Sequence, residues 1–542
     1  MAESLGVEYL LALSAIGIYF HAIFVSITLG FPLAIMALLF AYSRTGASEY
    51  MRAARILTYV LSVNFALGAI TGTLVEFGLV QVWPGTIAAI ASFFLAPLAL
   101  ELIAFANEIA FLILFIVTLG RVRPMISILI LGVYWVFAVY SGLLITTVNS
   151  WMNVPWGVAT IPGALYPFLP EYGPLAVDAQ KLVALKILLL ASGLPLQDII
   201  QTPEASNVVG IILNDPYLAF YSPYAWVSVA HNIVAALIVG LSIALLGFSY
   251  RLYKSKDVKY AQIIRVFYPI LLILILIQPT IIGHYMGVNV AYYNPVKFAM
   301  MEGAYTTYHN PIIGFLAYGD PNHPIIGFDR FYASCREQTI TLGELANSLG
   351  LTRENLLEIS NNLGIKLDTQ RLDNVLSTKV SDVCIGDLKS VESRIRAVNI
   401  AYYTKIFGGV IAFISAILLA GVMYRIPLVS SISRRLVNII GRGDYAKSIF
   451  ILTILIALGV ALAAVLGWYV REVGRKPWTI YGLIYPSEVI TVVDYARTLE
   501  FTIFASAIII AINIAGIYAM YIVASRHAVF TQLLERSLSG RR

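Results

Sequence analysis

The sequence is poor in charged residues and in cysteine. Only 12% of its 542 residues are Asp, Glu, Lys or Arg, whereas soluble globular chains average about 25%. Its two cysteines are too few for a cysteine-based zinc or iron–sulfur site, and no Cys-x-x-Cys-His motif is present to attach a haem covalently. The first ten residues contain no basic group. Because the apolar run that follows is too long for a signal peptide, we expect a true membrane span.

Apolar residues dominate instead, at 59% of the chain with a mean hydropathy of +0.82. The net charge of +6 is usual for a membrane protein with basic loops, and we expect no nucleic-acid partner. Continuous apolar runs rather than alternation indicate helices and not a β-barrel. We therefore expect an all-α polytopic protein of the cell membrane with about nine transmembrane helices, near residues 10–42, 54–80, 87–118, 125–149, 222–250, 263–287, 399–424, 446–470 and 499–524.

Basic residues orient these spans, since Lys and Arg concentrate in cytoplasmic loops. The clusters follow the odd-numbered spans, which predicts an external N-terminus and a cytoplasmic C-terminus. The link after the eighth span is an exception, because its predicted side is external and it contains Arg471, Arg475 and Lys476. The clusters that follow the rule are Arg44, Arg52 and Arg55; Arg121 and Arg123; Arg251, Lys254, Lys256, Lys259 and Arg265; Arg425, Arg434, Arg435, Arg442 and Lys447; and Arg526, Arg536, Arg541 and Arg542.

Two long segments fall on the predicted outer side. Residues 150–221 are rich in Pro, Gly and Tyr, and residues 288–398 form a larger loop. We accordingly divide the chain into residues 1–287 with six spans, the external loop 288–398, and residues 399–542 with three spans.

The larger loop contains a small helical module. Leu342 to Leu363 predicts two short amphipathic helices around a turn at Gly350. The pattern superficially resembles a helix-turn-helix, but an external position favours a packing module. Cys335 and Cys384 flank the module on the oxidising side, where a disulfide and a free pair are both open.

The third span contains two acids, Glu101 and Glu108. Seven residues are close to two helical turns, so both carboxyls lie on one face, about 10 Å apart along the axis. A carboxylate at membrane depth costs at least ~2.5 kcal/mol and is tolerated mainly in a bundle interior, a cavity or a proton path. The pair therefore predicts proton handling, with satisfaction by neighbouring helices as the simpler alternative.

Two histidines, His21 and His231, also lie inside apolar spans. A lone histidine in a span is often a hydrogen-bonded packing residue. Two of them together with intramembrane acids favour a metal or haem centre, for which imidazole is the usual axial ligand. On spacing alone, a haem protein and a proton-coupled transporter remain comparable.

Five stretches resemble a known family. They are FHAIFVSITLG around His21, NFALGAITGTLVEF at 64–77, LAPLALELIAFANE at 95–108, NSWMNVP at 149–155 and GWYVREVGRKPW at 467–478. Together with WVSVAHNIVAALIVG around His231, they are similar in order and position to subunit I of the cytochrome bd-type quinol oxidases. The resemblance extends over nearly the whole chain.

The resemblance implies a terminal oxidase with a low-spin haem b, a high-spin haem b and a haem d (or a third haem b). It implies that quinol is oxidised near the outer face and oxygen is reduced to water, which builds a proton gradient without pumping. By correspondence, His231 would ligate the low-spin haem, and His21 and Glu472 the two high-spin haems. The other implied positions are Glu101 and Glu108 at the haem d pocket and its proton supply, Lys297 and Glu302 in the quinol loop, and Lys405 in place of a family Arg. By their charge, Arg475 and Lys476 are candidates to neutralise haem propionates, with contact to lipid headgroups as the simpler alternative.

The chain departs from the family pattern in two places. The methionine that ligates the low-spin haem falls on Phe407 when Lys405 is placed opposite the family Arg, so Met300, Met301 or His284 become candidate ligands. The acid pair is also one residue shorter than in the family, which rotates Glu108 by about 100° unless a bulge restores the register.

We therefore predict the haem-bearing catalytic subunit of a quinol:oxygen oxidoreductase that assembles with a second membrane subunit, either the usual subunit II or a paralogue of this chain. A non-catalytic paralogue that scaffolds a partner oxidase is one alternative. A haem-free proton-coupled transporter is another, although no interrupted paired helices favour it. Trp468 and Trp478 are expected to be membrane-interface anchors.

Overall fold

The structure is a computed structural model that describes residues 2–158, 163, 165–174, 178–211, 213, 215–424, 427–490 and 495–525. Arg425, Arg526, Arg536, Arg541 and Arg542, which helped to predict the orientation, lie outside these residues. Within the described ranges, nine helical segments are long and apolar enough to cross a membrane. The predicted all-α bundle is confirmed.

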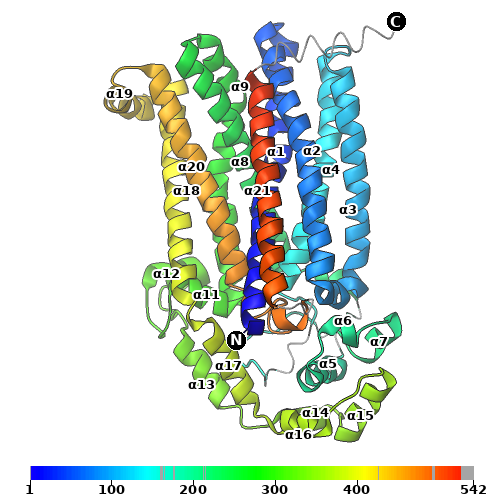
Figure 1. The fold of residues 1–542 in the computed structure, drawn as a ribbon. Coiled ribbons are helices and arrows are strands. Elements are labelled where there is room, and N and C mark those ends of the chain that lie inside the picture. The colour runs from blue at the N-terminus through cyan, green and yellow to red at the C-terminus, as the bar shows by residue number, and fades with distance from the viewer. Residues whose placement is uncertain are drawn as a thin grey trace, which may run out of the picture.

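The spans run roughly parallel, and the start of α1 and the end of α21 lie at opposite ends of the bundle (Figure 1). Most spans are single helices that extend beyond the apolar core predicted for them. The sixth is composite, because a π-helical turn, Gln278–Ile282, joins α9 to α10. The bounds are α1 Ala2–Thr45, α2 Ser48–Val82, α3 Pro84–Thr118, α4 Pro124–Asn153, α8 Pro223–Ser255, α9 Val258–Ile277, α10 Gly283–Tyr293, α18 Ile395–Tyr424, α20 Tyr445–Val473 and α21 Tyr495–Ser525.

Helix α1 is central, packing against α2, α4, α8, α9 and α21. Its closest approach is to α8, where a Cβ on Gly30 would lie 2.8 Å from the Gly240 Cα and a Cβ on Gly240 would collide with the Ser26 backbone. Only glycine at both positions allows this crossing. The Asn64 side chain of α2 donates to the Phe24 carbonyl of α1 at 2.9 Å, which fixes α2 against α1 in the apolar interior.

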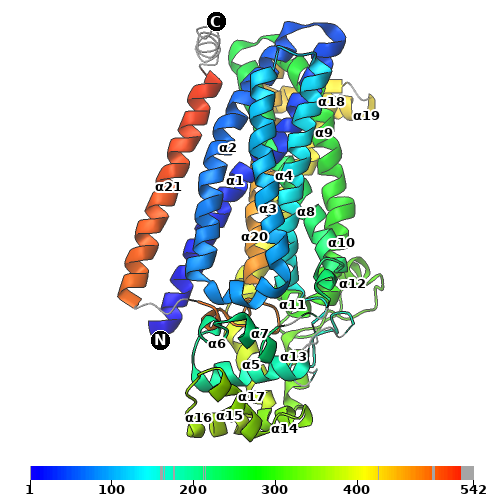
Figure 2. The same ribbon diagram turned by 90° about the vertical axis from the view of Figure 1, so that its right-hand side faces the viewer.

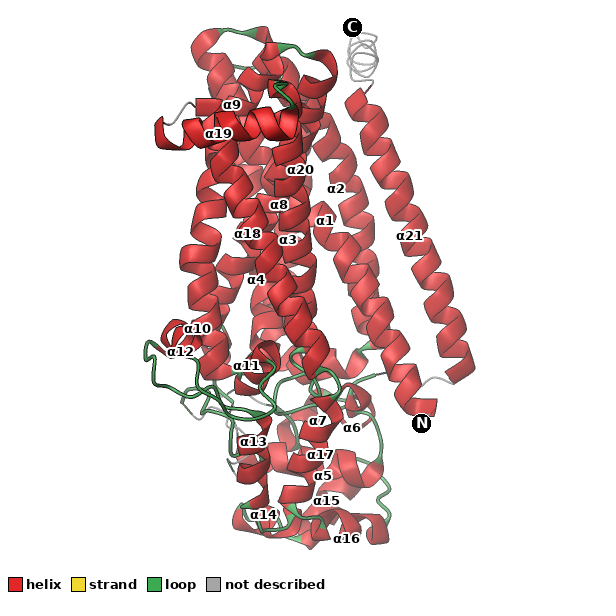
Figure 3. Cartoon of the chain, turned by 90° about the vertical axis from the view of Figure 1, so that its left-hand side faces the viewer, coloured by secondary structure: helices red, strands yellow, loops and turns green. Residues whose placement is uncertain are grey.

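Both long external segments gather at the end of the bundle that holds the N-terminus (Figure 2). The first contains α5 Ala179–Ser192, α6 Leu196–Ile199 and α7 Pro203–Val208, followed by a 3₁₀ turn at Pro216–Ala219. The second contains α11 Pro295–Glu302, α12 Pro311–Tyr318, α13 Phe328–Arg336, α14 Leu342–Ser348, α15 Arg353–Asn362, α16 Thr369–Ser377 and α17 Val380–Glu392. At the opposite end, α19 Pro427–Gly441 lies across the helix ends (Figure 3).

The helical module inside the larger loop folds as predicted. Helices α14 and α15 are separated by Gly350, whose φ of +78° favours glycine. Each helix begins with a capping box, Thr341 with Glu344 and Thr352 with Asn355. A disulfide joins Cys335 of α13 to Cys384 of α17, so the bonded alternative holds.

Candidate functional site

His21 contacts its neighbour Thr71 on α2. Its Nδ1 lies 3.1 Å from the Thr71 hydroxyl, which also lies within hydrogen-bond distance of the Leu67 carbonyl at 3.0 Å and the Gly68 carbonyl at 3.2 Å. When the hydroxyl donates to one of these carbonyls it can accept from Nδ1–H, and in that tautomer the Nε2 lone pair is free to bind a metal. A Cβ on Gly72 would lie 3.0 Å from Cε1 of the ring, so a small residue is needed beside the imidazole.

His231 is held by Gln278, the first residue of the π-helical turn. The Gln278 amide nitrogen lies 3.2 Å from His231 Nδ1 and donates to the His231 carbonyl at 3.0 Å. π-Helical turns inside α-helices occur frequently at functional sites. Sequence reasoning missed Gln278 and Thr71; the Gln278-Pro279 pair inside an apolar span was the available signal for the former.

A polar cluster lies where α4 and α20 end and α8 begins, at the side of the bundle predicted to be external. Arg471 donates to Asn149 at 2.5 Å, to Ser228 at 2.9 Å and to Ser150 at 3.1 Å. Arg471 was predicted only as part of a basic run. In the structure it is 7% exposed and ties three spans together.

Both carboxylate oxygens of Glu472 accept hydrogen bonds within this cluster. One carboxylate oxygen accepts from Asn149 at 3.1 Å, and the other accepts from Arg475 at 2.6 Å. Tyr19 of α1, two residues from His21, lies within electrostatic range of Glu472. The fold therefore brings the segments of two predicted iron ligands together, from opposite ends of the sequence.

The same cluster contains donors without a protein acceptor. Arg475 is 5% exposed, and its Nε and Nη1 are buried and have no hydrogen-bond partner among the residues that the structure describes. Unpaired buried donors of this kind need an explanation, and a carboxylate-bearing group such as a haem propionate fits their chemistry. Lys476 beside it is also buried, and burial lowers its pKa to about 7.

Lys297 and Glu302, predicted as a pair, point to different places. Lys297 is 2% exposed and donates to the Asn153 side chain, next to the Arg471 cluster. Burial lowers its pKa well below the usual value, and the nearby arginines add to this effect. Glu302 accepts instead from the Tyr403 hydroxyl at 2.7 Å. Burial raises the pKa of Glu302, although the phenol opposes the shift.

The acid pair on α3 lies against neighbouring spans. Glu101 accepts from the Ser141 hydroxyl at 3.0 Å and is in side-chain hydrogen-bond contact with Glu76. Glu108 is 5% exposed and lies within electrostatic range of Tyr134. Helix α3 is continuous between the two acids, so no bulge restores the family spacing there.

The residues considered for the sixth ligand are scattered. Phe407 is 64% exposed on α18, and His284 is exposed on α10. Met300 and Met301 are buried in the external core. Lys405 lies within electrostatic range of His231. Trp478 is fully buried, so the prediction that it anchors the membrane interface is wrong.

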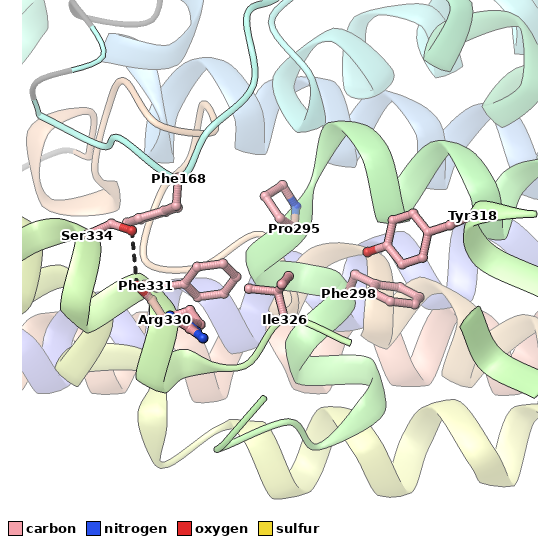
Figure 4. Close-up of a pocket in the computed structure, with 8 residues that line it drawn as sticks. All are labelled: Phe168, Pro295, Phe298, Tyr318, Ile326, Arg330, Phe331 and Ser334. Atoms are coloured by element: carbon pink, nitrogen blue, oxygen red, sulfur yellow. Dashed lines mark hydrogen bonds between the residues drawn. The ribbon is translucent and has the colours of Figure 1, made fainter. Parts of the chain in front are cut away.

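A cavity of about 310 Å³ lies between the external segments. Figure 4 shows aromatic side chains on both sides of it, with Arg330 and Ser334 at one end. It shares one helix with the predicted quinol residues, because Pro295 and Phe298 are on α11 with Glu302. Its lining residues are Phe168, Pro295, Phe298, Tyr318, Ile326, Arg330, Phe331 and Ser334.

Among the described residues, no group of three or more His, Cys, Asp or Glu side chains could hold a metal ion. A free transition-metal site built from such side chains is therefore not supported in this part of the chain. A haem needs only one or two protein ligands, and His21, His231 and Glu472 each stand in a place where a single ligand is held by its own neighbours.

Comparison with known proteins gives a consistent family. The family model described as cytochrome bd terminal oxidase subunit I matches residues 12–313 and 309–528. A putative cytochrome bd menaquinol oxidase subunit I from Bacillus subtilis is 22% identical over 309 residues, 56% of this chain and 59% of that protein. The cytochrome bd-II ubiquinol oxidase subunit 1 of Escherichia coli is 35% identical over 141 residues, 26% of this chain and 27% of that protein.

These alignments span less than two thirds of the curated relatives' length. The fold is matched more completely. The structure of bd oxidase from Geobacillus thermodenitrificans has a TM-score of 0.66 at 18% identity, and the match covers 97% of this chain and 100% of that one. With nine candidate spans in its described residues, this multi-pass protein of the cell membrane belongs to the cytochrome bd terminal oxidase subunit I family.

Proposed function

We propose that this chain is the haem-bearing catalytic subunit of a quinol:oxygen oxidoreductase. The observation that supports this most directly is the cluster of Arg471, Glu472 and Arg475, in which a predicted iron ligand is oriented while two guanidinium nitrogens stay buried without an acceptor among the described residues. An anionic cofactor group such as a haem propionate would accept from these donors.

The proposed ligands are His231 for a low-spin haem b, and His21 and Glu472 for a high-spin haem b and a haem d or third haem b. When bound, these groups supply one-electron transfer and the oxygen-reducing centre. Each proposed ligand is contacted by neighbouring side chains: Thr71 contacts the His21 ring, Gln278 contacts the His231 ring, and an amide and a guanidinium bind Glu472. Arg475 and Lys405 would offset the negative charge of the propionates.

Quinol oxidation is proposed at the outer face, around Glu302. A base there must accept protons as quinol is oxidised, and the carboxylate is half-buried beside Tyr403. The α18 surface next to it is apolar and exposed at Ile400 and Phe407, which gives a membrane-dissolved quinol direct access. Lys297 would affect this site indirectly, through its hydrogen bond to Asn153, and would not contact the quinol as a second ligand.

Proton supply to oxygen reduction is proposed through Glu101 and Glu108. Both are held within the bundle near hydroxyl groups, and protonatable residues at membrane depth commonly form proton relays. Protons released outside at Glu302 and taken up from inside would build a gradient without a pump.

A second membrane subunit is proposed to cover the α2–α3 face. Glu76 is exposed there, in the last two turns of the α2 span, and contacts Glu101 of α3, whose neighbour Leu102 is also exposed. A carboxyl facing lipid is costly, so a protein partner in the cell membrane is the better neighbour. Whether it is subunit II or a paralogue follows from the composition of the purified complex.

The test is a reduced-minus-oxidised visible spectrum with haem extraction on the purified complex. His231→Ala should remove the low-spin haem signal, while His309→Ala on the exposed loop should leave it unchanged. Glu302→Gln should slow quinol oxidation and spare oxygen reduction by an artificial one-electron donor; Glu354→Gln is its exposed control. A complex without haem would refute the oxidase and favour a scaffold or a transporter.

A further inference from the structure

A second buried cluster lies outside the proposed site, where three external segments meet. Asp387 on α17 accepts hydrogen bonds of 2.5 Å from the hydroxyls of both Tyr166 and Tyr485, on the same carboxylate oxygen. The two hydroxyls are also 2.9 Å apart. Trp478 packs edge-on against Tyr166, with ring centroids 5.1 Å apart. One carboxylate thus joins the larger loop, the first external segment and the α20–α21 link.

A buried ion pair reinforces the same junction. Lys186 of α5 donates to both oxygens of Glu488 at 2.6 and 2.8 Å, and the two residues are 5% and 8% exposed. The Lys186 ammonium also lies 3.6 Å from the centre of the Tyr485 ring, and the Tyr485 backbone N–H donates to Glu488 at 2.8 Å. Tyr485 is therefore fixed at its backbone, its ring and its hydroxyl.

The junction adjoins the cavity of Figure 4 through aromatic contacts. Tyr166 packs on Phe168 at 6.2 Å between centroids, and Phe168 packs on Phe331 at 4.9 Å. Both phenylalanines line the cavity (Figure 4). Phe331 is on α13, which is bonded to α17 by the disulfide three residues before Asp387. The Asp387 carboxylate therefore lies behind the side chains that line the cavity and is not itself a lining residue.

We propose that Asp387 is a positioning residue for quinol oxidation, because it fixes the Tyr166–Phe168 wall against α13 and so sets the shape of the cavity beside α11. The inference rests on the proposed quinol oxidation at this face. It assigns a role to a residue that lies behind the wall and that no motif in the sequence marks.

The charge state of Asp387 gives the inference a distinctive signature. Burial raises its pKa to about 6, opposed by the phenols of Tyr166 and Tyr485 and by Lys186, while Glu488 adds to the rise. An acid whose pKa is raised on docking favours the docked form at low pH, and that preference is lost as pH rises through about 6. The Michaelis constant for quinol should therefore rise with pH across this range.

The experiment uses the holo-complex with Asp387→Asn, and with Asp373→Asn as the control. Asp373 is an exposed acid of α16 in the same loop, paired with Arg353. Asp387→Asn should raise the KM for quinol about fivefold, the size expected for one buried hydrogen bond, and remove the step near pH 6. Oxygen reduction by an artificial one-electron donor and the reduced haem spectrum should be unchanged. Tyr166→Phe should raise the KM and move the pH step upward, because the Tyr166 phenol no longer opposes the rise in the pKa of Asp387.

An Asp387→Asn complex with the wild-type KM and the wild-type pH profile would overturn the inference. So would an equal loss of quinol and artificial-donor activity with an altered haem spectrum, because that pattern indicates general damage. If the Asn variant does not assemble, Tyr485→Phe carries the same KM test. Failure of the proposed function looks different, because Glu302→Gln would then oxidise quinol normally or the wild-type complex would not oxidise it at all.

Discussion

The buried ion pair between Lys186 and Glu488 gives the sharpest stability prediction. Its side chains are only 6% and 10% exposed, so neither charge can return to water without opening the junction of external segments. Lys186→Met keeps most of the apolar volume but leaves the Glu488 carboxylate buried and unpaired. Removing one partner of a buried pair costs about 3–5 kcal/mol, a large fraction of the ~5–15 kcal/mol that stabilises a typical domain.

The cost should be local, because the bundle itself is not touched. Hydrogen exchange of the membrane-embedded complex reports the opening free energy of each segment, and protection should fall in α5 and at Pro486–Glu488 while the spans are unchanged. The matched control is Arg353→Met, which removes one partner of the Arg353–Asp373 pair. That pair is 39% and 53% exposed, and exposed pairs of this kind often contribute nothing measurable.

The double variant Lys186→Met/Glu488→Leu separates the free energy lost with the ion pair from the cost of leaving one charge buried alone. With both charges gone, no carboxylate is left buried alone, so the double variant should be more stable than Lys186→Met by itself. The reasoning would be refuted if Lys186→Met were as harmless as Arg353→Met. It would also be refuted if the effects of Lys186→Met and of Glu488→Leu, measured separately, simply added in the double variant.

Three further predictions follow from other parts of the fold. Cys335→Ala/Cys384→Ala opens a loop of 49 residues, which should cost the external module up to about 4 kcal/mol and raise its proteolysis without changing the haem spectrum; unchanged proteolysis would contradict this. Gly72→Ala should displace the neighbouring imidazole and alter the haem spectrum, whereas Gly78→Ala on the same helix, where a Cβ meets nothing within 4 Å, should not. Quinol turnover should fall on acidification at a higher pH than an ordinary glutamate of pKa about 4.3 would give, because burial raises the pKa of Glu302 and a protonated carboxyl cannot accept a proton; Glu302→Gln should remove this limb of the pH profile.

The spans were predictable because each apolar run satisfies the bilayer by itself. The composite sixth span was not, since the hydropathy of 263–287 is continuous through the π-helical turn. What breaks the helix there is Gln278-Pro279, and the turn places an amide against the His231 ring. A hydropathy profile shows which segments can lie in lipid, but it does not show polar contacts between side chains inside the bundle.

The candidate site was predictable as a set of residues but not as an arrangement. Lys297 and Glu302 are five residues apart, which on a helix separates their directions by about 140°. The spacing alone therefore argued against a shared ligand, but it could not say that one would meet Asn153 and the other Tyr403. Those partners come from α4 and α18, and only the packing of the whole bundle chooses them.

The stretch from Arg471 to Glu488 is one continuous segment, but its two ends contact different parts of the protein. Its first residues, Arg471, Glu472 and Arg475, face the spans and hold the proposed haem ligand. Its later ones, Tyr485 and Glu488, lie in the external junction with Asp387 and Lys186. One short segment therefore joins the proposed oxygen-reducing site to the proposed quinol-facing region. A variant at Tyr485 or Glu488 can affect the proposed ligand Glu472 through the backbone, so the haem spectrum is the measurement that separates an effect on quinol from an effect on that ligand.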